Sequence, residues 1–302
     1  MMSYQLGYVD DRFEPAHSKA GKRFRPLLCL IATEAVGGKA ERALRTAASI
    51  ELLHNFSLIH DDIEDHDPSR RHRATVWKVW GESQAINTGD GMLALAGRLI
   101  LDSSPDASVT LDISRHFQQM CLTLTEGQYL DMSFEGRDNV RSAEYMDMIE
   151  RKTGALIAFS LWSGAYLGGA GEETRDALRV FGLELGKAFQ IQDDIMGMWG
   201  SKEMTGKEAA TDLYNRKKTL PLLAALERAG PEEIESLQQF FRCASDDAGA
   251  VFSILDATAA RSLCEARRTA HLKSAMEALG RTAIDGGARE ELEALAHELT
   301  GQ

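Results

Sequence analysis

Residues 51–65 (ELLHNFSLIHDDIED) form an apolar run that ends in a cluster of carboxylates. The apolar side chains recur at helical spacing, which predicts a helix to about residue 65; they are Leu52, Leu53, Phe56, Ile59 and Ile63. Asp61 and Asp65 are four residues apart and share one helix face, as do Asp62 and Asp65 at three apart. Neighbouring like charges repel by roughly 0.2–0.5 kcal/mol at this spacing, so we expect a positive partner to offset them.

A divalent cation is one partner that suits these carboxylates. Mg²⁺ prefers oxygen ligands, keeps some of its water and takes its other ligands from phosphate. Arg70 and Arg71 follow the cluster and carry planar donor forks that fit phosphate oxygens. His54 lies two turns before Asp61 on the same side of the helix. For this cluster alone, a solvated acidic helix end is an equally good interpretation.

A second segment repeats the pattern. Residues 178–197 (LRVFGLELGKAFQIQDDIMG) keep apolar side chains at helical spacing and then present Asp193 and Asp194. If the two acidic helices faced each other across a cavity, a diphosphate bridged by Mg²⁺ would fill the space between them. The recurrence therefore favours a binding site over two unrelated solvated helix ends.

The rest of the chain favours an all-α fold in a single domain. The 302 residues contain only six prolines, and they show no strand alternation, low-complexity linker or solenoid repeat. We expect helices over the following ranges: 27–36, 40–65, 82–102, 106–135, 142–168, 173–199 and four or five more in 219–300. Loops are expected over residues 66–75 and 200–219. The small residues Gly89, Gly91, Ala94 and Ala96 predict close helix packing or a subunit contact.

The charge of the chain excludes a nucleic-acid partner. The net charge is −12 and the isoelectric point is about 5.2, whereas nucleic-acid binding needs a basic face. Basic residues gather at 22–25, 70–73 and 216–218, where they suit a small anion; scattered solvated cations are the alternative.

The cysteines and the apolar runs indicate the cellular compartment of the protein. The four cysteines show neither metal-binding spacing nor a disulfide framework. The sequence has no signal-peptide pattern and no apolar run near the ~18 residues of a membrane span. We therefore expect a cytoplasmic protein without a transmembrane segment.

Taken together and in order, the motifs resemble those of the trans-isoprenyl diphosphate synthases, the polyprenyl synthetase family. The motifs are GKRFRP, HDDIEDHDPSRR, FQIQDD, TGK and DLYNRKKTLP, between about residues 21 and 221. The resemblance implies one isoprenoid synthase domain over residues 1–302, with about ten or more helices around a central cavity. It also implies a homodimer. The N-terminal helix of the family is expected to be shortened here, because only about twenty residues precede the first basic motif.

The resemblance implies a reaction. Isopentenyl diphosphate would condense head-to-tail with dimethylallyl, geranyl or farnesyl diphosphate, by ionisation, condensation and elimination of a proton. Three Mg²⁺ ions per site are expected, with Asp61, Asp65 and Asp193 as ligands. Asp62 and Asp194 would complete the two acidic motifs. The family's second motif has a third aspartate where this chain has Gly197, which puts in doubt the contribution of the last carboxylate.

The resemblance also distributes the polar residues between the substrates. Those implied for isopentenyl diphosphate are Lys22, Arg25, His54 and Arg71. Those implied for the allylic diphosphate and its departure are Arg70, Lys152, Thr153, Lys207 and Lys217. Those implied for the cavity near the allylic substrate are Gln128, Asp131 and Gln190. Arg23 is expected to face solvent, and Lys218 has no assigned role.

Product length is expected to depend on the residues one turn before Asp61. Phe56 lies five residues before it and Ser57 four before. A bulky ring beside a small neighbour resembles synthases that stop near geranylgeranyl diphosphate. Phe56 is also a plausible core residue, and farnesyl or longer products remain open.

Two further alternatives belong to other classes. A class I terpene cyclase shares the first acidic motif, but it needs a second metal motif that this sequence lacks, and it has no use for Lys22, Arg25 and Arg71. A non-catalytic subunit of a hetero-oligomeric synthase typically loses aspartates of the first motif, whereas all three are present here.

Overall fold

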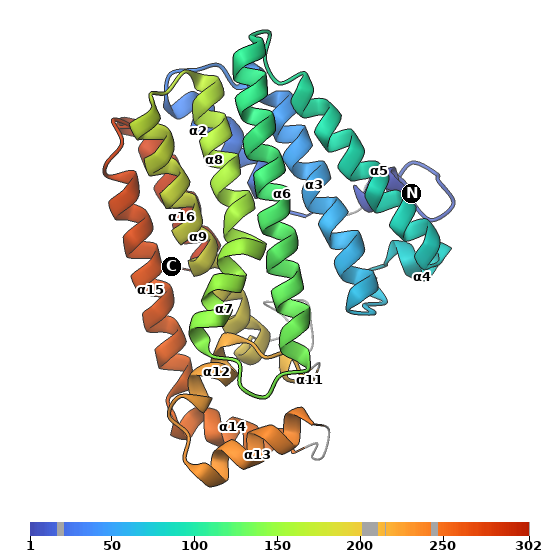
Figure 1. Cartoon of the computed structure of the whole chain (residues 1–302), viewed down its shortest axis with the longest axis vertical. Helices are drawn as coiled ribbons and strands as arrows, with labels where there is room; N and C mark the ends of the chain where they lie inside the picture. The colour runs from blue at the N-terminus through green and yellow to red at the C-terminus, as the bar shows by residue number, and fades with distance from the viewer. Residues whose placement is uncertain (17–20, 201–210, 215, 243–246, 302) are drawn as a thin grey trace. The chain divides into compact units, whose positions relative to one another are not determined.

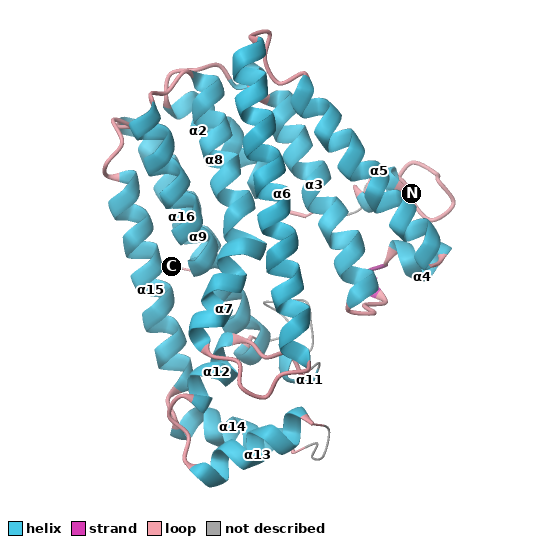
Figure 2. Cartoon of the chain, viewed as in Figure 1, coloured by secondary structure: helices cyan, strands magenta, loops and turns pink. Residues whose placement is uncertain are grey.

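The computed structural model describes residues 1–16, 21–200, 211–214, 216–242 and 247–301. Within these residues the fold is all-α apart from one short hairpin, which confirms the predicted fold class (Figures 1 and 2). The helices before residue 140 are α1 Met2–Gln5, α2 Phe24–Ala35, α3 Leu44–Glu64, α4 Val76–Trp80, α5 Glu82–Leu101 and α6 Ala107–Glu135. Those that follow are α7 Ser142–Ile149, α8 Ala155–Gly168, α9 Glu172–Trp199, α11 Thr211–Tyr214, α12 Leu220–Leu226, α13 Pro231–Phe241, α14 Ala248–Ala257, α15 Ala260–Leu279 and α16 Gly286–Thr300.

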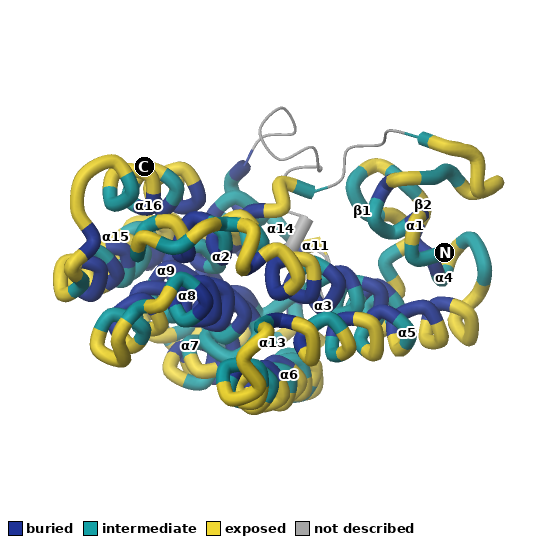
Figure 3. Tube along the Cα trace, turned by 90° about the horizontal axis from the view of Figure 1, so that it is seen from above, coloured by how far each residue is buried: buried dark blue, intermediate teal, exposed yellow. Residues whose placement is uncertain are grey.

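The chain divides into two compact units. Unit 1 comprises Met1–Gln119 and Phe159–Arg175, and unit 2 comprises Met120–Ala158 and Asp176–Gln302. Buried and exposed residues alternate along the helices, as expected of amphipathic helices in a packed protein (Figure 3). Within the described part of the chain, none of the helices is both long and apolar enough to cross a bilayer.

Small residues bring the helices of unit 1 close together. A Cβ at Gly89 of α5 would overlap the ring of His60 in α3, and the Ser49 hydroxyl donates to the Ala96 carbonyl at 2.8 Å. The small-residue patch therefore packs α5 on α3, as the sequence predicted. In α8, Gly164 admits the carbonyl of Cys29 from α2, because a Cβ there would overlap that oxygen.

Unit 2 is built on the buried face of α9. Its core combines apolar side chains of α7, α9 and α12, including Met148, Ile149, Ile191, Ile195 and Leu223. Two glycines let the backbone of α9 lie directly against neighbouring backbone. A Cβ at Gly182 would meet the backbone of Ala158, and one at Gly186 would meet the backbone of Gly154. The acidic end of α9 is thereby fixed against the segment that carries Lys152 and Thr153.

The expected loop 200–219 contains a short helix, α11 (Thr211–Tyr214). Two further expectations are also corrected. The expected loop 66–75 contains an antiparallel hairpin, in which β1 (Ser69–Arg70) pairs with β2 (Arg73–Ala74). The expected continuous helix 142–168 is interrupted by a π-helical turn, Glu150–Gly154. The sequence indicates neither, because the hairpin lacks the usual Asn-Gly turn and the π-helical turn keeps helical composition.

We predict that Gly164→Ala lowers the free energy of unfolding by about 1–3 kcal/mol, because the added methyl overlaps a backbone carbonyl that has little room to move. Gly97→Ala in α5 is the matched control, since no described atom outside the adjoining helix backbone and chain neighbours lies within 4 Å of the position that its Cβ would occupy. There, helix propensity alone should stabilise the protein by roughly 0.5–1 kcal/mol. Urea unfolding measures both; an unchanged midpoint in Gly164→Ala contradicts the packing.

Candidate active site

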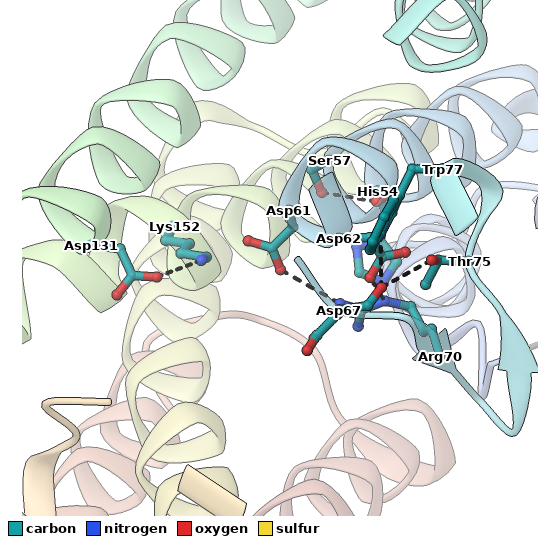
Figure 4. Close-up of polar contacts among 10 residues, drawn as sticks. All are labelled: His54, Ser57, Asp61, Asp62, Asp67, Arg70, Thr75, Trp77, Asp131 and Lys152. Carbon is teal, nitrogen blue, oxygen red and sulfur yellow. Dashed lines mark hydrogen bonds and ion pairs between the residues drawn. The ribbon is translucent and has the colours of Figure 1, made fainter. Parts of the chain in front are cut away.

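The three aspartates at the end of α3 have different surroundings. Asp62 is buried, and its Oδ1 accepts a hydrogen bond from Arg70 Nε at 2.5 Å (Figure 4). Asp61 is partly exposed, with its Oδ2 3.7 Å from Arg70 Nη2, and Asp65 is also partly exposed. Burial raises the pKa of Asp62 to about 6, against the opposing effect of Arg70. Arg70 is therefore a positive partner of the kind that the sequence required for this cluster.

The fit of this cluster to a divalent cation can be judged from its oxygens. Within the described residues, no three His, Cys, Asp or Glu side chains converge on one point that could hold a metal ion. Two partly exposed carboxylates one turn apart, Asp61 and Asp65, nevertheless match the few protein ligands that Mg²⁺ uses when water and phosphate supply the others. The second oxygen of Asp62, Oδ2, is buried without a hydrogen-bond partner among the described residues. The donor set thus has the chemistry that Mg²⁺ prefers.

A basic cluster lies further back along α3. Arg25 in the first turn of α2 donates from Nη1 to Nε2 of His54 at 3.3 Å. The pKa of His54 is well below its usual value. Burial is the largest cause, and the positive charges of Arg25, Arg71 and Arg70 add to it. Because Arg25 can only donate, the neutral His54 ring accepts at Nε2 and carries its proton on Nδ1. Lys22 is exposed, just before the start of α2.

Gly21 makes room for Arg71. A Cβ at Gly21 would overlap Nη2 of Arg71, so the guanidinium lies directly against the glycine backbone. Four of the cationic or ionisable groups predicted from the sequence, Arg25, His54, Arg70 and Arg71, therefore belong to one part of unit 1.

The hairpin that follows α3 carries both arginines. Arg70 ends β1, and Arg71 is the first residue of the two-residue loop. The carbonyl of Asp67 accepts from the Thr75 hydroxyl at 2.9 Å and from the Trp77 indole at 2.8 Å, which closes the base of the hairpin (Figure 4). The roles of Thr75 and Trp77 were not predicted from the sequence. The only indication there is that two side chains able to donate hydrogen bonds follow the basic pair Arg70–Arg71.

Phe56 and Ser57 are oriented differently. The ring of Phe56 lies 4.7 Å from that of His60, edge to face, and His60 lies in turn against Gly89 of α5. The hydroxyl of Ser57 donates back to the His54 carbonyl at 2.8 Å (Figure 4). Both side chains are half-buried, so neither is sealed in the core.

In unit 2 the structure pairs two predicted residues directly. Lys152, in the π-helical turn, donates from Nζ to Oδ2 of Asp131 in α6 at 2.6 Å (Figure 4). Gly127 permits this approach, because a Cβ there would overlap the backbone nitrogen of Lys152. Gln128, one turn before Asp131, is half-buried. The cost of burying the ammonium is offset by the carboxylate.

The second acidic pair, like the first, has one buried aspartate and one more exposed aspartate. Asp194 is buried and accepts hydrogen bonds from Tyr145 Oη at 2.6 Å, from Gln190 Nε2 at 3.1 Å and from the Leu220 amide at 3.2 Å. Asp193 is exposed. The amide nitrogen of Gln190 faces Asp194, because the carboxylate oxygen is the acceptor of this pair. Its carbonyl then accepts from the Thr153 hydroxyl at 2.9 Å.

The remaining residues named from the sequence are the lysines and the glycine near the second acidic motif. Lys218 donates to the carbonyls of Phe134, Glu135 and Arg137. It therefore stabilises the carboxyl end of α6, a role not assigned from the sequence. Lys217 is half-buried, Gly197 lies within α9, and Lys207 lies outside the described residues.

Comparison with known proteins decides the family. The polyprenyl synthetase family model matches residues 9–258. A (2E,6E)-farnesyl diphosphate synthase of Mycobacterium tuberculosis is 38% identical over 309 aligned residues, covering 98% of this chain and 84% of the relative. The chain belongs to the polyprenyl synthetase family. It is a trans-prenyltransferase of a family that uses isopentenyl and allylic diphosphates and depends on a divalent metal.

Solved structures of polyprenyl synthetases agree with this. A polyprenyl synthetase from Streptomyces coelicolor A3(2) matches with a TM-score of 0.90 and 35% identity, over 98% of this chain and 90% of that one. A geranylgeranyl pyrophosphate synthase from Corynebacterium glutamicum, complexed with isoprenyl diphosphate and magnesium, matches with a TM-score of 0.85 and 30% identity, over 93% and 87% of the two chains.

We predict that Tyr145→Phe destabilises the protein by about 1–3 kcal/mol, because it removes a donor from a buried carboxylate. Tyr214→Phe is the matched control, since Tyr214 is 67% exposed. Chemical denaturation measures the difference, and equal unfolding free energies in the two variants would show that Tyr145 does not support Asp194.

Proposed function

We propose that the chain condenses isopentenyl diphosphate head-to-tail with an allylic diphosphate and that its main product is geranylgeranyl diphosphate. One observation carries the proposal: α3 presents the carboxylates of Asp61 and Asp65 at its end and, two turns earlier, His54 with its arginine neighbours. Helix α3 thus carries the proposed cation-binding face and contributes His54 to the proposed anion-binding cluster, which is completed by arginines of α2 and the hairpin. This combination suits two diphosphate substrates and the metal that accompanies one of them.

The departing diphosphate needs charge neutralisation more than a strong nucleophile, because the barrier lies in separating an anion from an allylic carbocation. Mg²⁺, when bound, assists that departure as a Lewis acid. We assign Asp61, Asp65 and Asp193 as its ligands, with three ions per site. The exposure of Asp193 and the partial exposure of the other two support this choice.

Several cationic residues are proposed to hold the leaving diphosphate. Arg70 and Lys152 each carry a carboxylate partner, Asp62 and Asp131, at 2.5 and 2.6 Å. These partners hold the cations in place, and the diphosphate oxygens would share them. Lys207 and Lys217 are assigned to close over the diphosphate.

The carbocation is proposed to face oxygen dipoles of unit 2. Asp194 fixes the amide of Gln190, and Gln190 in turn orients the Thr153 hydroxyl proton toward itself. The remaining lone pairs of Thr153 are then available to a cation. Gln128 is assigned to the wall near the allylic substrate. The departing diphosphate is proposed to take the final proton, since no dedicated base is evident in the sequence.

Isopentenyl diphosphate is assigned to Lys22, Arg25, His54 and Arg71. Neutral His54 offers its Nδ1 proton as a donor, and the two guanidinium groups supply charge. The double bond of isopentenyl diphosphate then attacks the carbocation. All three aspartates of the first motif are present, which argues against a non-catalytic subunit.

Geranylgeranyl diphosphate is proposed from Phe56 and Ser57, one large and one small side chain on the turn before Asp61. The solved Corynebacterium glutamicum relative carries the same product name. The alternative is a farnesyl or longer product, which the name of the Mycobacterium tuberculosis relative favours.

We also propose that residues 1–302 form one catalytic domain and that the protein is a homodimer. Helices α6, α8 and α9 each have residues in both units, which supports a single domain. Leu111, Leu122 and Tyr129 of α6 are at least 50% exposed and recur at intervals of eleven and seven residues, so they form an apolar stripe on one face. Such a stripe suits a second copy of the chain.

We predict that purified protein converts isopentenyl diphosphate and an allylic primer into prenyl diphosphates only when Mg²⁺ is present. Asp61→Asn should lower kcat about a hundredfold or more, since it removes a proposed metal ligand. Asp102→Asn, at an exposed position after α5, is the control. Radiolabelled turnover with each primer measures both. Full activity of Asp61→Asn, or turnover unaffected by EDTA, contradicts the metal assignment.

We predict that Phe56→Ala lengthens the product by at least one isoprene unit, because removing the ring opens space on the turn before Asp61. Leu101→Ala is the control, since Leu101 ends α5 and is 65% exposed. Chromatography of the dephosphorylated products gives the chain length. An unchanged distribution in Phe56→Ala rejects the assignment of Phe56 to the floor of the cavity.

A further inference from the structure

The hairpin that carries Arg70 and Arg71 is strained. Both loop residues have positive φ angles, 53° for Arg71 and 63° for His72. A type I′ turn requires this conformation and normally uses Asn-Gly, because side chains with a Cβ clash there. Each strand has only two residues, too few for a hairpin to be stable alone. Contacts from elsewhere must therefore hold the hairpin in shape.

The N-terminal segment supplies those contacts. Residues 1–16, here called the N-terminal clasp, lie against β2. Arg73 donates from Nη1 to the Tyr4 carbonyl at 3.0 Å and from Nη2 to the Val9 carbonyl at 2.9 Å. The Tyr4 hydroxyl donates to the Ala74 carbonyl at 2.7 Å. Arg73 also lies over the Tyr4 ring, with Cζ 3.9 Å from the centroid. Both residues of β2 are thus tied to the clasp.

The clasp is itself anchored. The ring of Tyr4 meets Trp80 edge to face at 4.9 Å, and Phe13 stacks on the same indole at 5.4 Å. Oδ1 of Asp10 accepts from the amides of Arg12 and Glu14, which orders the intervening turn. A segment fixed in this way can transmit rigidity to the hairpin.

The clasp also borders the arginines directly. One small cavity is lined by Tyr4, Gln5 and Gly7 of the clasp and by Arg70, Arg71 and Arg73 of the hairpin. Arg71 is limited on another side by Gly21. The orientation of Arg71 therefore depends on residues before the first motif.

We propose that the clasp, through Tyr4 and Arg73, is a positioning element that holds Arg71 for the diphosphate of isopentenyl diphosphate. The inference rests on the assignment of Arg71 to that substrate. Arg73 acts as a tie, because both of its terminal nitrogens already donate to clasp carbonyls. Tyr4 and Arg73 are positioning residues, and neither is required to touch the substrate.

The test separates positioning from folding. Arg73→Gln should raise KM for isopentenyl diphosphate about tenfold, because displacement of a positioned group by about 1 Å is costly. Tyr4→Phe, which loses one hydrogen bond, should raise it about three- to fivefold. KM for the allylic substrate should change less than twofold in both variants. Tyr8→Phe, within the clasp and 54% exposed, is the control.

A rescue variant addresses the strain. Adding His72→Gly to Arg73→Gln should restore at least half of the lost affinity, because glycine adopts the positive φ without a penalty. An Arg73→Gln variant that raises both KM values equally, or neither, overturns the inference. A wild type without turnover overturns the proposed function instead. In that case, calorimetric titration with inorganic diphosphate still tests the clasp, and equal affinity of wild type and Arg73→Gln overturns it.

Discussion

A buried carboxylate is costly unless donors surround it, and this constraint organises both halves of the chain. Asp62 is buried against Arg70, and Asp194 is buried among Tyr145, Gln190 and Leu220. Adjacent residues of a helix point about 100° apart. Burial of one aspartate therefore turns its neighbour, Asp61 or Asp193, toward a more exposed position. Each acidic pair thus consists of a buried aspartate and a more accessible one, which we propose as the metal ligand.

The two buried aspartates also position cationic and neutral side chains. Arg70 links Asp62 to the hairpin, and the hairpin carries Arg71 toward Arg25 and His54. In unit 2, Asp194 fixes the amide of Gln190, which orients the hydroxyl of Thr153. Two buried carboxylates, Asp62 and Asp194, therefore determine which hydrogen-bond donors and acceptors their neighbours present.

Local periodicity was enough to predict the longer helices, and it placed the paired aspartates on α3 and α9. The family resemblance was enough to propose Lys152, Thr153 and Gln190 as members of the site. Local sequence did not predict that Asp62 is buried and Asp61 partly exposed, since adjacent residues of one type have the same propensity. The roles of Tyr4, Arg73 and Tyr145 also escaped prediction, because their partners lie 49 to 70 residues away. The hairpin was missed because tertiary contacts, rather than turn chemistry, hold it.

The central claim is that, within an acidic pair, one aspartate binds the metal and the other stabilises the fold. The variants Asp61→Asn and Asp62→Asn test it most directly. Each variant is titrated calorimetrically with inorganic diphosphate, with and without Mg²⁺, and is unfolded in urea. Asp61→Asn should lose the Mg²⁺-dependent part of the affinity and keep its unfolding free energy. Asp62→Asn should lose about 1–3 kcal/mol of stability, because half-buried Arg70 loses its closest charged partner, at 2.5 Å, and keeps the more distant Asp61. The account is contradicted if Asp61→Asn is the destabilised variant, or if the two variants behave alike.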